Sequence, residues 1–416
     1  MESSTWINRK EIKMSYPVIN EQLEQLNHLI SHQNAAIDLL ASDKRAAMAT
    51  NIADIAMLCK NGEIMELMDY GDQITMAWAD GETNYTPSLN LCHESDELLE
   101  DAESIHGAFF EWDKTLPFGT QFDAPEAIYY FDGTEAAGTY HIEIGTDYGT
   151  GWSTAKAIQF TLTDAPAADD QLVIDCGNDN ANDPTNGRTW NVYAKGSTTS
   201  KQTGTTSNGT GGTKLGSTST TSAQHTNERV NAISRVVYGY NRWSQSGLRQ
   251  FLNSEAAAGA WWTAQNPWDR PHALAATKNG FLKGYDASVV QHLKPIKVVT
   301  VACNADGNTE DVTYDRVFLR SLEQMYTAPM ASGKEGVFWE YYKRLLGRTT
   351  PAPLWQTYTR LIKYALEAPT SAQNCWCRSA NLNSAYNAML VYSSGYVNGN
   401  TAVAAIRCAP SVFISE

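Results

Sequence analysis

Few side chains in this 416-residue chain have the types and spacing that chemistry needs. His28 and His32 are four residues apart, which places two imidazoles on one helix face and suits a metal ion. Exposed helix positions explain the same spacing, and we favour that interpretation. Glu310 and Asp311 are adjacent and have the surroundings of a solvated loop, so we assign them no acid–base role. We predict no catalytic residue, no metal site, no cofactor and no enzymatic activity.

The cysteines do not form a recognisable pattern either. There are seven, an odd number, and the closest pair, Cys375 and Cys377, has one residue between its members. Zinc ribbons and redox motifs use two intervening residues. We therefore interpret the cysteines as free, buried or incidental thiols.

One region has the composition of a binding surface. From Asn381 to Cys408 the only charged residue is Arg407, and Tyr and Asn alternate with small residues. Tyr offers contact area at low entropic cost and Asn offers adaptable hydrogen bonds, a combination typical of antibody paratopes. A Tyr-rich sheet core explains the composition equally well, and periodicity does not decide between the two.

The N-terminal part of the chain predicts a long helix over residues 15–58. Its apolar residues recur at alternating spacings of four and three, a heptad rhythm that favours a short coiled coil. The seam consists of Ile19, Leu23, Leu26, Ile30, Gln33, Ile37 and Leu40. An amphipathic helix packed on its own domain is the alternative. We expect residues 1–62 to be an oligomerisation segment.

Period-two patterns follow over residues 63–195 and predict an antiparallel β domain, a sandwich or a barrel. The expected strands cover residues 73–78, 127–131, 139–144, 157–162, 171–174 and 189–193. Residues 196–227 are almost wholly Ser, Thr, Gly, Asn, Gln and Lys. Such a stretch buries little apolar area, so we expect a linker or surface loop.

Residues 228–416 complete the chain and contain seven of its twelve Trp residues. We predict helices at 244–252, with Ser244 as the N-cap, and at 338–346 and 357–366. A strand is expected at 296–301, and short strands after Cys375. The predicted fold class is therefore multidomain α+β.

The net charge of −15 conceals two opposite parts. Residues 1–195 carry 10 Lys and Arg against 33 Asp and Glu, or −23, whereas residues 196–416 carry 21 against 13, or +8. The overall acidity argues against nucleic acid as a partner, because phosphate binding needs a basic face. We also expect no signal peptide and no membrane insertion, since no long apolar run occurs.

Several motifs resemble a known family, the variable proteins of diversity-generating retroelements. Near the C-terminus these are Arg-Ser-Ala-Asn at 378–381, Val-Tyr-Ser-Ser-Gly-Tyr-Val at 391–397 and Arg-Cys-Ala-Pro at 407–410. Upstream, Tyr-Asn-Arg-Trp-Ser-Gln-Ser-Gly-Leu-Arg-Gln-Phe-Leu-Asn at 240–253 and Gly-Phe-Leu at 280–282 resemble the same family's C-type-lectin-like domain.

The resemblance implies a C-type-lectin-like fold of the formylglycine-generating-enzyme type over about 228–416, with a variable region at about 374–408. In this family adenines of one gene segment are randomised, so Asn codons become almost any residue while a framework holds the backbone. Matched framework positions are Arg378, Ser379, Ala380, Ser393, Ser394, Gly395, Val397, Arg407 and Pro410. Matched diversified, ligand-binding positions are Leu382, Asn383, Tyr386, Asn387, Leu390, Tyr392, Tyr396, Asn398, Asn400, Thr401, Val403 and Ile406. Cys375, Cys377 and Cys408 fit the same process as further random products.

The resemblance implies a phage or prophage receptor-binding protein that determines tropism. Its partners would be a host cell-surface receptor (protein or glycan) and a virion tail component, the latter through the N-terminal region. The chain would form a homotrimer, located in the phage tail or released outside the cell after synthesis in the bacterial cytoplasm. The cysteine pair and metal-bound substrate site of formylglycine-generating enzymes have no match here, so the fold does not imply an enzyme.

Two rival functions belong to other classes. A carbohydrate-active tail-fibre enzyme would need convergent carboxylates, and residues 378–408 contain none. A structural virion protein or an adhesin of fixed specificity would bury its Tyr and Asn residues as packing. The exposure of Tyr386, Tyr396 and Asn400 separates the last class from a ligand-binding face.

Overall fold

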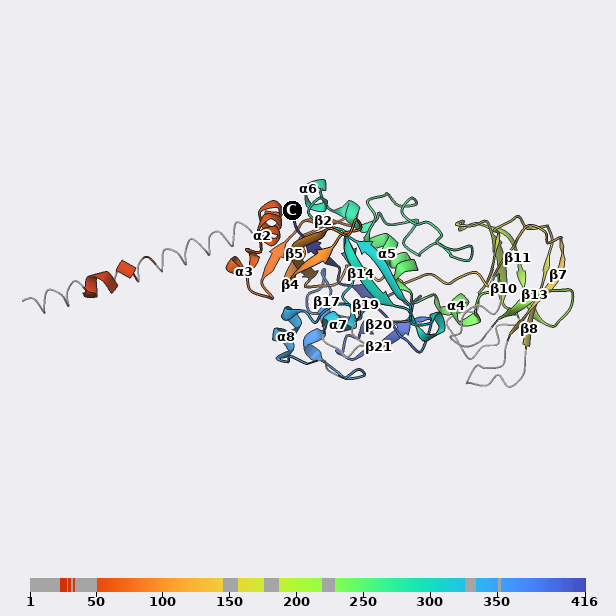
Figure 1. The fold of residues 1–416 in the computed structure, drawn as a ribbon. Helices are drawn as coiled ribbons and strands as arrows, with labels where there is room; N and C mark the ends of the chain where they lie inside the picture. Colours follow the sequence, from red (N-terminus) through yellow and green to blue (C-terminus); the bar gives the residue numbers. More distant parts are fainter. Residues whose placement is uncertain are drawn as a thin grey trace, which may run out of the picture.

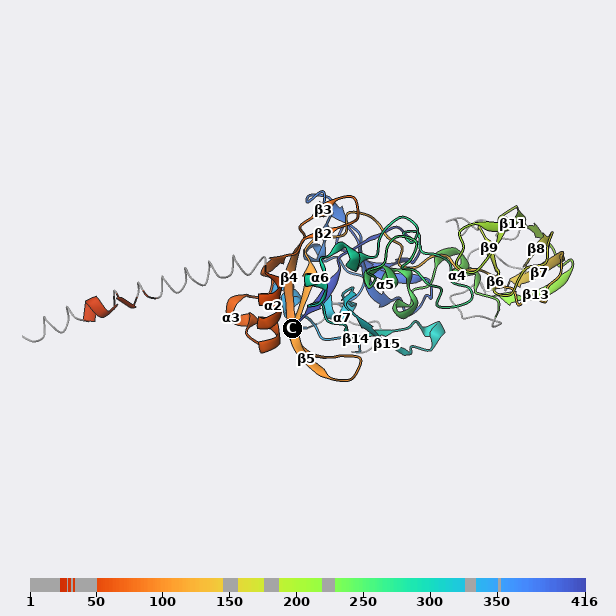
Figure 2. The same ribbon diagram turned by 90° about the horizontal axis from the view of Figure 1, so that it is seen from above.

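The computed structural model describes residues 23–27, 29–30, 33, 51–144, 156–175, 187–218, 229–325, 334–350 and 353–416. Short helices and many strands occur together in these residues, which confirms the α+β class. Figure 1 and Figure 2 show a larger body that contains the C-terminus and a smaller β body beyond helix α4 (Ile233–Tyr238). Among the described residues no helix is both long and apolar enough to cross a membrane.

Each body has its own hydrophobic core. The larger core combines residues from 55–122 with residues from 243–414, whereas the smaller core contains residues from 128–236. The β body is therefore an insertion between two parts of the larger body. The domain boundaries expected at residues 62, 195 and 227 differ from this arrangement, and the −23 and +8 parts of the chain do not coincide with the two bodies.

The central sheet of the larger body joins distant parts of the chain. Its strand order is β1-β4-β5-β23-β16, and β5 pairs antiparallel with β23 with Phe110 opposite Val412. The strands are β1 (Gln73–Thr75), β4 (Ser88–Leu98), β5 (Ser104–Trp112), β16 (Val317–Phe318) and β23 (Ser411–Ile414). Residues 107–112 of β5 are all buried, so both faces of this sheet are covered there.

A second sheet of the larger body has the order β21-β20-β19-β22. It consists of β19 (Cys375–Ala380), β20 (Asn387–Val391), β21 (Val397–Thr401) and β22 (Arg407–Cys408). Every residue of β19 is buried, whereas β21 lies at one edge of the sheet. Three two-stranded sheets complete the body: β2 (Trp78–Ala79) with β3 (Asn84–Tyr85), β14 (Ile296–Val301) with β15 (Glu310–Asp315), and β17 (Lys363–Tyr364) with β18 (Ala372–Gln373).

Short helices surround these sheets. The α-helices are α2 (Ile52–Asn61), α3 (Ile64–Leu67), α5 (Gly247–Leu252), α6 (Ala287–Val290), α7 (Leu322–Met325) and α8 (Glu340–Leu346). The 3-10 turns are η1 (Trp243–Gln245), η2 (Phe281–Gly284), η3 (Asn304–Asp306) and η4 (Thr359–Leu361).

Two helix predictions require correction. The N-cap of α5 is Ser246, whose hydroxyl oxygen accepts from the Arg249 N–H at 3.2 Å, because Ser244 is occupied by a hydrogen bond to Asp311 at 2.5 Å. The helix predicted over 357–366 is reduced to η4 and the strand β17. Main-chain pairing of this segment with residues 395–397 replaces its local helical preference.

A buried ionic cluster joins the central sheet to the segments around it. The Glu111 carboxylate on β5 contacts Arg320 and the Tyr342 hydroxyl, and lies 3.0 Å from the Lys363 ammonium. Burial alone would raise the pKa of Glu111, but the charges of Arg320 and Lys363 outweigh burial and hold that pKa below its ordinary value. Removing one partner of such a buried set leaves an uncompensated charge, so the cluster fixes how these elements pack.

The inserted body is a β-sandwich. One sheet has the order β11-β10-β9-β6 and the other β12-β8-β7-β13. The rings of Phe160 on β8 and Trp190 on β10 face each other across the core, with their centres 5.9 Å apart. The first sheet contains β6 (Tyr129–Tyr130), β9 (Gln171–Ile174), β10 (Thr189–Tyr193) and β11 (Ser200–Thr205). The second contains β7 (Gly138–Ile144), β8 (Lys156–Leu162), β12 (Ser207–Asn208) and β13 (Thr213–Thr218).

The stretch expected to be a linker belongs to this sandwich. Residues 200–218 form β11, β12 and β13, and β13 pairs with β7 in parallel, so the sandwich is not wholly antiparallel. The linker prediction, which relied on polar composition, was wrong for these residues. Their strands add to existing sheets by main-chain hydrogen bonds and contribute few side chains to the core. Residues 219–227 lie outside the described residues.

The structure describes only part of the helix predicted over residues 15–58. Residues 23–27, 29–30 and 33 are helical and exposed, and they lie apart from the larger body in Figure 1. Seam residues 19, 37 and 40 lie outside the described residues, as do His28 and His32. Asn51 has extended backbone and caps α2, whose Ile55, Ala56 and Cys59 are buried in the larger core. The last turns of the predicted helix therefore belong to the larger body and not to an oligomerisation segment.

Candidate functional site

The candidate face is built on strand β19 at the centre of the second sheet. The framework residues Arg378, Ser379 and Ala380 are buried in this strand, as is Val397 at the start of β21. Gly395 has φ 85°, and a Cβ atom there would lie 2.6 Å from the Tyr358 carbonyl oxygen. The turn before β21 therefore requires glycine.

The loop between β19 and β20 is held from outside the region. Asn241 is 1% exposed, and its side-chain amide donates to the carbonyl oxygens of Asn381, Ser384 and Asn387 at 3.2, 2.7 and 2.8 Å. The Asn241 N–H also donates to the Ala385 carbonyl at 3.0 Å. The motif at 240–253 thus positions the loop by contacts to its main chain.

Two further segments hold the same face. The Asn304 N–H in η3 donates to the Leu382 carbonyl at 2.8 Å, and its side-chain amide contacts the Asn383 Oδ1 at 3.0 Å. The Val403 N–H donates to the Tyr238 carbonyl at 3.1 Å. Helix α4, which returns from the β-sandwich, therefore ends directly beside the candidate residues.

The twelve candidate residues differ in exposure. Asn383 is exposed, and nine others are half-buried: Leu382, Tyr386, Asn387, Tyr392, Tyr396, Asn398, Asn400, Thr401 and Val403. Leu390 is 0% exposed and Ile406 is 6% exposed, and both belong to the larger core. We therefore remove these two from the candidate contact residues, because their side chains pack into the larger core.

Tyrosines form two groups on this face. Tyr392 and Tyr396 flank the turn before β21 with ring centres 6.4 Å apart, and the Tyr386 ring lies 5.1 Å from that of Tyr238. Burial raises the pKa of Tyr392, and the neighbouring Tyr396 adds to this effect. These side chains offer aromatic surface with hydroxyl groups.

A neighbouring segment that the sequence did not single out extends the face. Residues 356–358 pair with 395–397: the Tyr358 N–H donates to the Gly395 carbonyl at 2.7 Å, and the Val397 N–H donates to the Gln356 carbonyl at 3.2 Å. Just before them Trp355 is 44% exposed and has φ 62°, a left-handed conformation unusual for a bulky residue. The signal available in the sequence was a Trp within the Pro-containing stretch 351–358.

The cysteines of the region are not available to a ligand. Cys375, Cys377 and Cys408 are each 0% exposed. Burial raises the pKa of all three thiols, that of Cys377 to about 12. The six described cysteines are free, which agrees with their interpretation as buried thiols.

Charge and metal-binding groups are sparse here. The Arg407 side chain beside the face is paired with Glu367 at 2.7 Å. A polar hollow of about 450 Å³ adjoins it, lined by residues that include Gln373, Asn374, Ser393 and Ala405. Within the described part of the chain no three or more His, Cys, Asp and Glu residues gather in a way that would hold a metal ion.

Comparison with known proteins found a family match for one part of the chain. Residues 217–412 match the model of a family described as a domain of unknown function (DUF6273). This match covers the return from the β-sandwich and nearly all of the C-terminal part of the larger body. No curated protein and no solved structure matches the chain.

Proposed function

We propose that this chain is a receptor-binding protein of a phage or prophage, and that the ten exposed or half-buried candidate residues contact a host cell-surface receptor. The observation that carries the proposal is the way the face is held. Its loops are fixed through main-chain carbonyl and N–H groups by Asn241, Asn304 and Tyr238, which lie outside the variable region. Side chains on such loops can change without loss of the scaffold.

The chemistry of the face favours binding over catalysis. Residues 378–410 contain no Asp, Glu or His, so no acid–base pair is available from this segment. Tyr, Asn and the nearby Trp355 combine flat apolar surface with neutral donors and acceptors. We therefore propose a neutral ligand patch, on a glycan or a protein, and we propose that the scaffold is a C-type-lectin-like domain of a retroelement variable protein.

The N-terminal segment would supply assembly and attachment. Leu23, Leu26 and Ile30 are helical and 50%, 52% and 46% exposed, which suits a seam covered by other copies of the chain. A homotrimer would present three faces together, and simultaneous binding raises the apparent affinity for receptors arrayed on a cell. We propose that the same region attaches the protein to a virion tail.

A cell-binding experiment tests the proposal. The labelled full-length chain is titrated against a panel of bacterial strains, and the triple variant Tyr386→Ala, Tyr396→Ala, Asn400→Ala is compared on each strain that binds. We expect at least a tenfold loss of affinity, since hot-spot aromatic residues carry much of the binding energy. Tyr314→Ala, a half-buried tyrosine on β15, is the matched control. Unchanged binding by the triple variant would reject this face.

The DNA around the gene gives an independent test. We expect a near-copy of the segment that encodes residues 374–408, differing from it at adenines, beside a reverse transcriptase gene. If neither is present, the variable-region part of the proposal fails and a binding domain of fixed specificity is left.

A further inference from the structure

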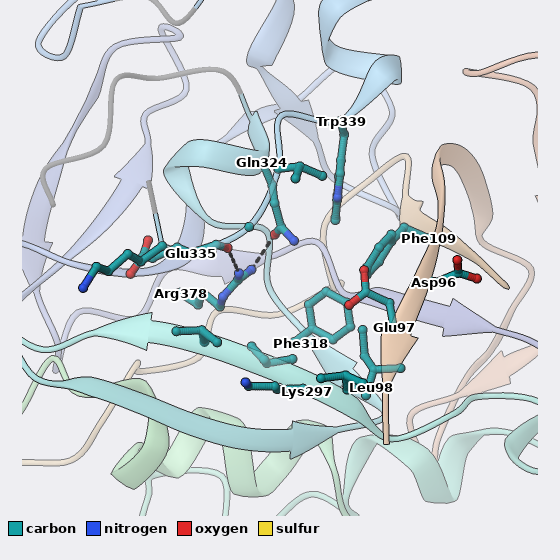
Figure 3. Close-up of a pocket in the computed structure, with 16 residues that line it drawn as sticks. Asp96, Glu97, Leu98, Phe109, Lys297, Phe318, Gln324, Glu335, Trp339 and Arg378 are labelled. Atoms are coloured by element: carbon teal, nitrogen blue, oxygen red, sulfur yellow. Dashed lines mark hydrogen bonds between the residues drawn. The ribbon is translucent and has the colours of Figure 1, made fainter. Parts of the chain in front are cut away.

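A second cleft lies away from the candidate face. It has a volume of about 340 Å³ and is lined by the end of β4, the strand β14, the segment 334–339 and single residues of β5, β16, α7 and β19. None of the twelve residues that the sequence assigned to ligand binding lines it. Figure 3 shows Phe109, Phe318 and Trp339 on one side of this cleft and Gln324 and Arg378 on the other.

The base of the cleft is aromatic. The Phe109 ring lies 5.2 Å from that of Trp339 and 5.9 Å from that of Phe318, measured between ring centres. All three side chains are at most 3% exposed, whereas Leu98 and Val337 at the rim are 40% and 57% exposed. The cleft therefore leads from exposed apolar residues to a buried aromatic surface, as expected where an apolar group binds.

A buried amide donor points into the cleft. Gln324 is 5% exposed, and its Oε1 accepts from the Arg378 guanidinium at 2.5 Å and from the Ser321 N–H at 3.0 Å. Its Nε2 faces the cleft in Figure 3 and has no hydrogen-bond acceptor among the described residues. An unpaired donor on the wall of a cleft favours a ligand that brings a carbonyl oxygen.

Glu97 supplies an acceptor on the opposite side. Its carboxylate accepts from the Ser95 hydroxyl at 2.8 Å and faces the cleft across from Arg378 in Figure 3. Burial raises the pKa of Glu97, and the charge of Arg378 partly offsets this effect. A donor and an acceptor on facing walls match the carbonyl and N–H groups of a peptide.

Strand β14 presents an unpaired edge to the same cleft. The Ala302 N–H donates to the Thr309 carbonyl at 2.9 Å, on the β15 side, whereas the N–H of Val301 donates to the Glu335 carboxylate at 3.0 Å instead of to β15. Main-chain groups alternate in direction along a strand, so those of Lys297 and Val299 also point away from β15. No partner for them occurs among the described residues, and both residues line the cleft.

Charge at the rim indicates what accompanies the apolar group. Lys297 is half-buried and has no ion-pair partner among the described residues, whereas Lys334 is paired with Glu310. An acidic residue next to the apolar anchor would neutralise Lys297.

We propose that this cleft binds an extended peptide segment of a partner protein. The peptide main chain pairs with the open edge of β14, an aromatic side chain packs against Phe109, Phe318 and Trp339, and an adjacent acidic residue contacts Lys297. Strand addition of this kind takes its affinity from main-chain hydrogen bonds and its specificity from side-chain pockets.

Calorimetric titration of the full-length chain with short peptides tests the proposal. The probe is acetyl-Asp-Phe-Val-Thr-amide, compared with versions in which Phe is replaced by Ala, Asp by Lys, or the Phe N–H is methylated. We expect the Ala version to bind at least about tenfold more weakly, because the buried aromatic group is lost. Methylation should also weaken binding several-fold, since it removes a main-chain donor.

A charge reversal on the protein identifies the site. Lys297→Glu should weaken the Asp peptide and strengthen the Lys peptide by about two- to fivefold each, a range typical of exposed ion pairs. Lys283→Glu, at an exposed position outside the cleft, should change neither. Equal binding of the Phe and Ala peptides, no effect of methylation, or no binding at millimolar peptide would each overturn the proposal.

Discussion

The side-chain amide of Asn241 donates a hydrogen bond to the carbonyl oxygen of Ser384 at 2.7 Å. A residue of one motif thereby fixes a loop that lies about 140 positions further along the chain. Because every residue type has the same main-chain carbonyl, this anchor is independent of the side chains that the loop displays. Constant backbone and changeable side chains are the requirement for a face whose specificity varies.

Replacing Asn241 should therefore damage the scaffold more than replacing a displayed residue. Asn241→Ala leaves the Ser384 carbonyl without its donor and removes one of the two donors of the Asn381 and Asn387 carbonyls. We expect the free energy of unfolding to fall by about 1–3 kcal/mol. Thr401→Ala, at a half-buried candidate position, should change it by less than about 0.5 kcal/mol. Urea denaturation of both variants measures the difference, and equal effects would contradict the role given to Asn241.

The sequence predicted correctly the strands that are determined by residues close to one another in the chain. The strands expected at 171–174, 189–193 and 296–301 are β9, β10 and β14 with the same bounds. Each has alternating or continuous apolar residues between turn-forming residues, so nearby side chains determine it. The short strands expected after Cys375 are likewise present as β19 to β23.

Long-range pairing explains what the sequence did not reveal. Phe110 of β5 and Val412 of β23 face each other although about 300 residues separate them, and no local pattern reports such a pairing. The same limit applies to the site. Leu390 and Tyr392 are two residues apart and both fit the variable pattern, yet Leu390 lies on an inner strand and is buried while Tyr392 is half-buried at a turn.

Trp355 offers a test in which two variants should differ in stability but not in binding. Its left-handed backbone is strained for any residue with a Cβ atom, so Trp355→Gly should raise the free energy of unfolding relative to Trp355→Ala by about 1 kcal/mol. Both variants remove the exposed Trp355 ring and should weaken binding to receptive cells by the same factor. Thermal unfolding and the cell titration provide the two readouts. A Gly variant no more stable than the Ala variant would show that the backbone at this position is not strained.

Glu126 predicts a pH dependence at the junction of the two bodies. It is 2% exposed, its Oε1 lies 3.2 Å from Arg235, and burial raises its pKa to about 7, with Arg235 opposing and Asp269 reinforcing the shift. The folded state thus binds a proton that the unfolded state releases between about pH 4.5 and 7. The contribution of Glu126 to stability is largest below this window and falls as pH rises through it, by at most about 3 kcal/mol.

The variant Glu126→Gln isolates that contribution. The difference in unfolding free energy between the variant and the natural chain should be small near pH 5. As pH rises toward 7 the variant should become the more stable of the two, because Glu126 ionises and Gln does not. Burial lowers the pKa of His272 to about 4, which gives an opposite slope between pH 4 and 6.5, but His272 is present in both proteins and cancels. A difference that is constant from pH 4.5 to 7.5 would contradict a raised pKa at Glu126.

The N-terminal heptads predict a trimer, and a neighbouring leucine outside the seam provides the control. Leu23, Leu26 and Ile30 follow the heptad rhythm, whereas Leu29 is 57% exposed and lies outside it. Light scattering of the natural chain should give three times the mass of one chain. Serine at all three seam positions should give the mass of a single chain, because the apolar contact between helices is lost. Leu29→Ser should leave the trimer intact, since its side chain does not enter the seam. If the natural chain has the mass of one chain, or if Leu29→Ser dissociates the assembly as completely as the seam variant, then the seam residues are not arranged as a coiled coil.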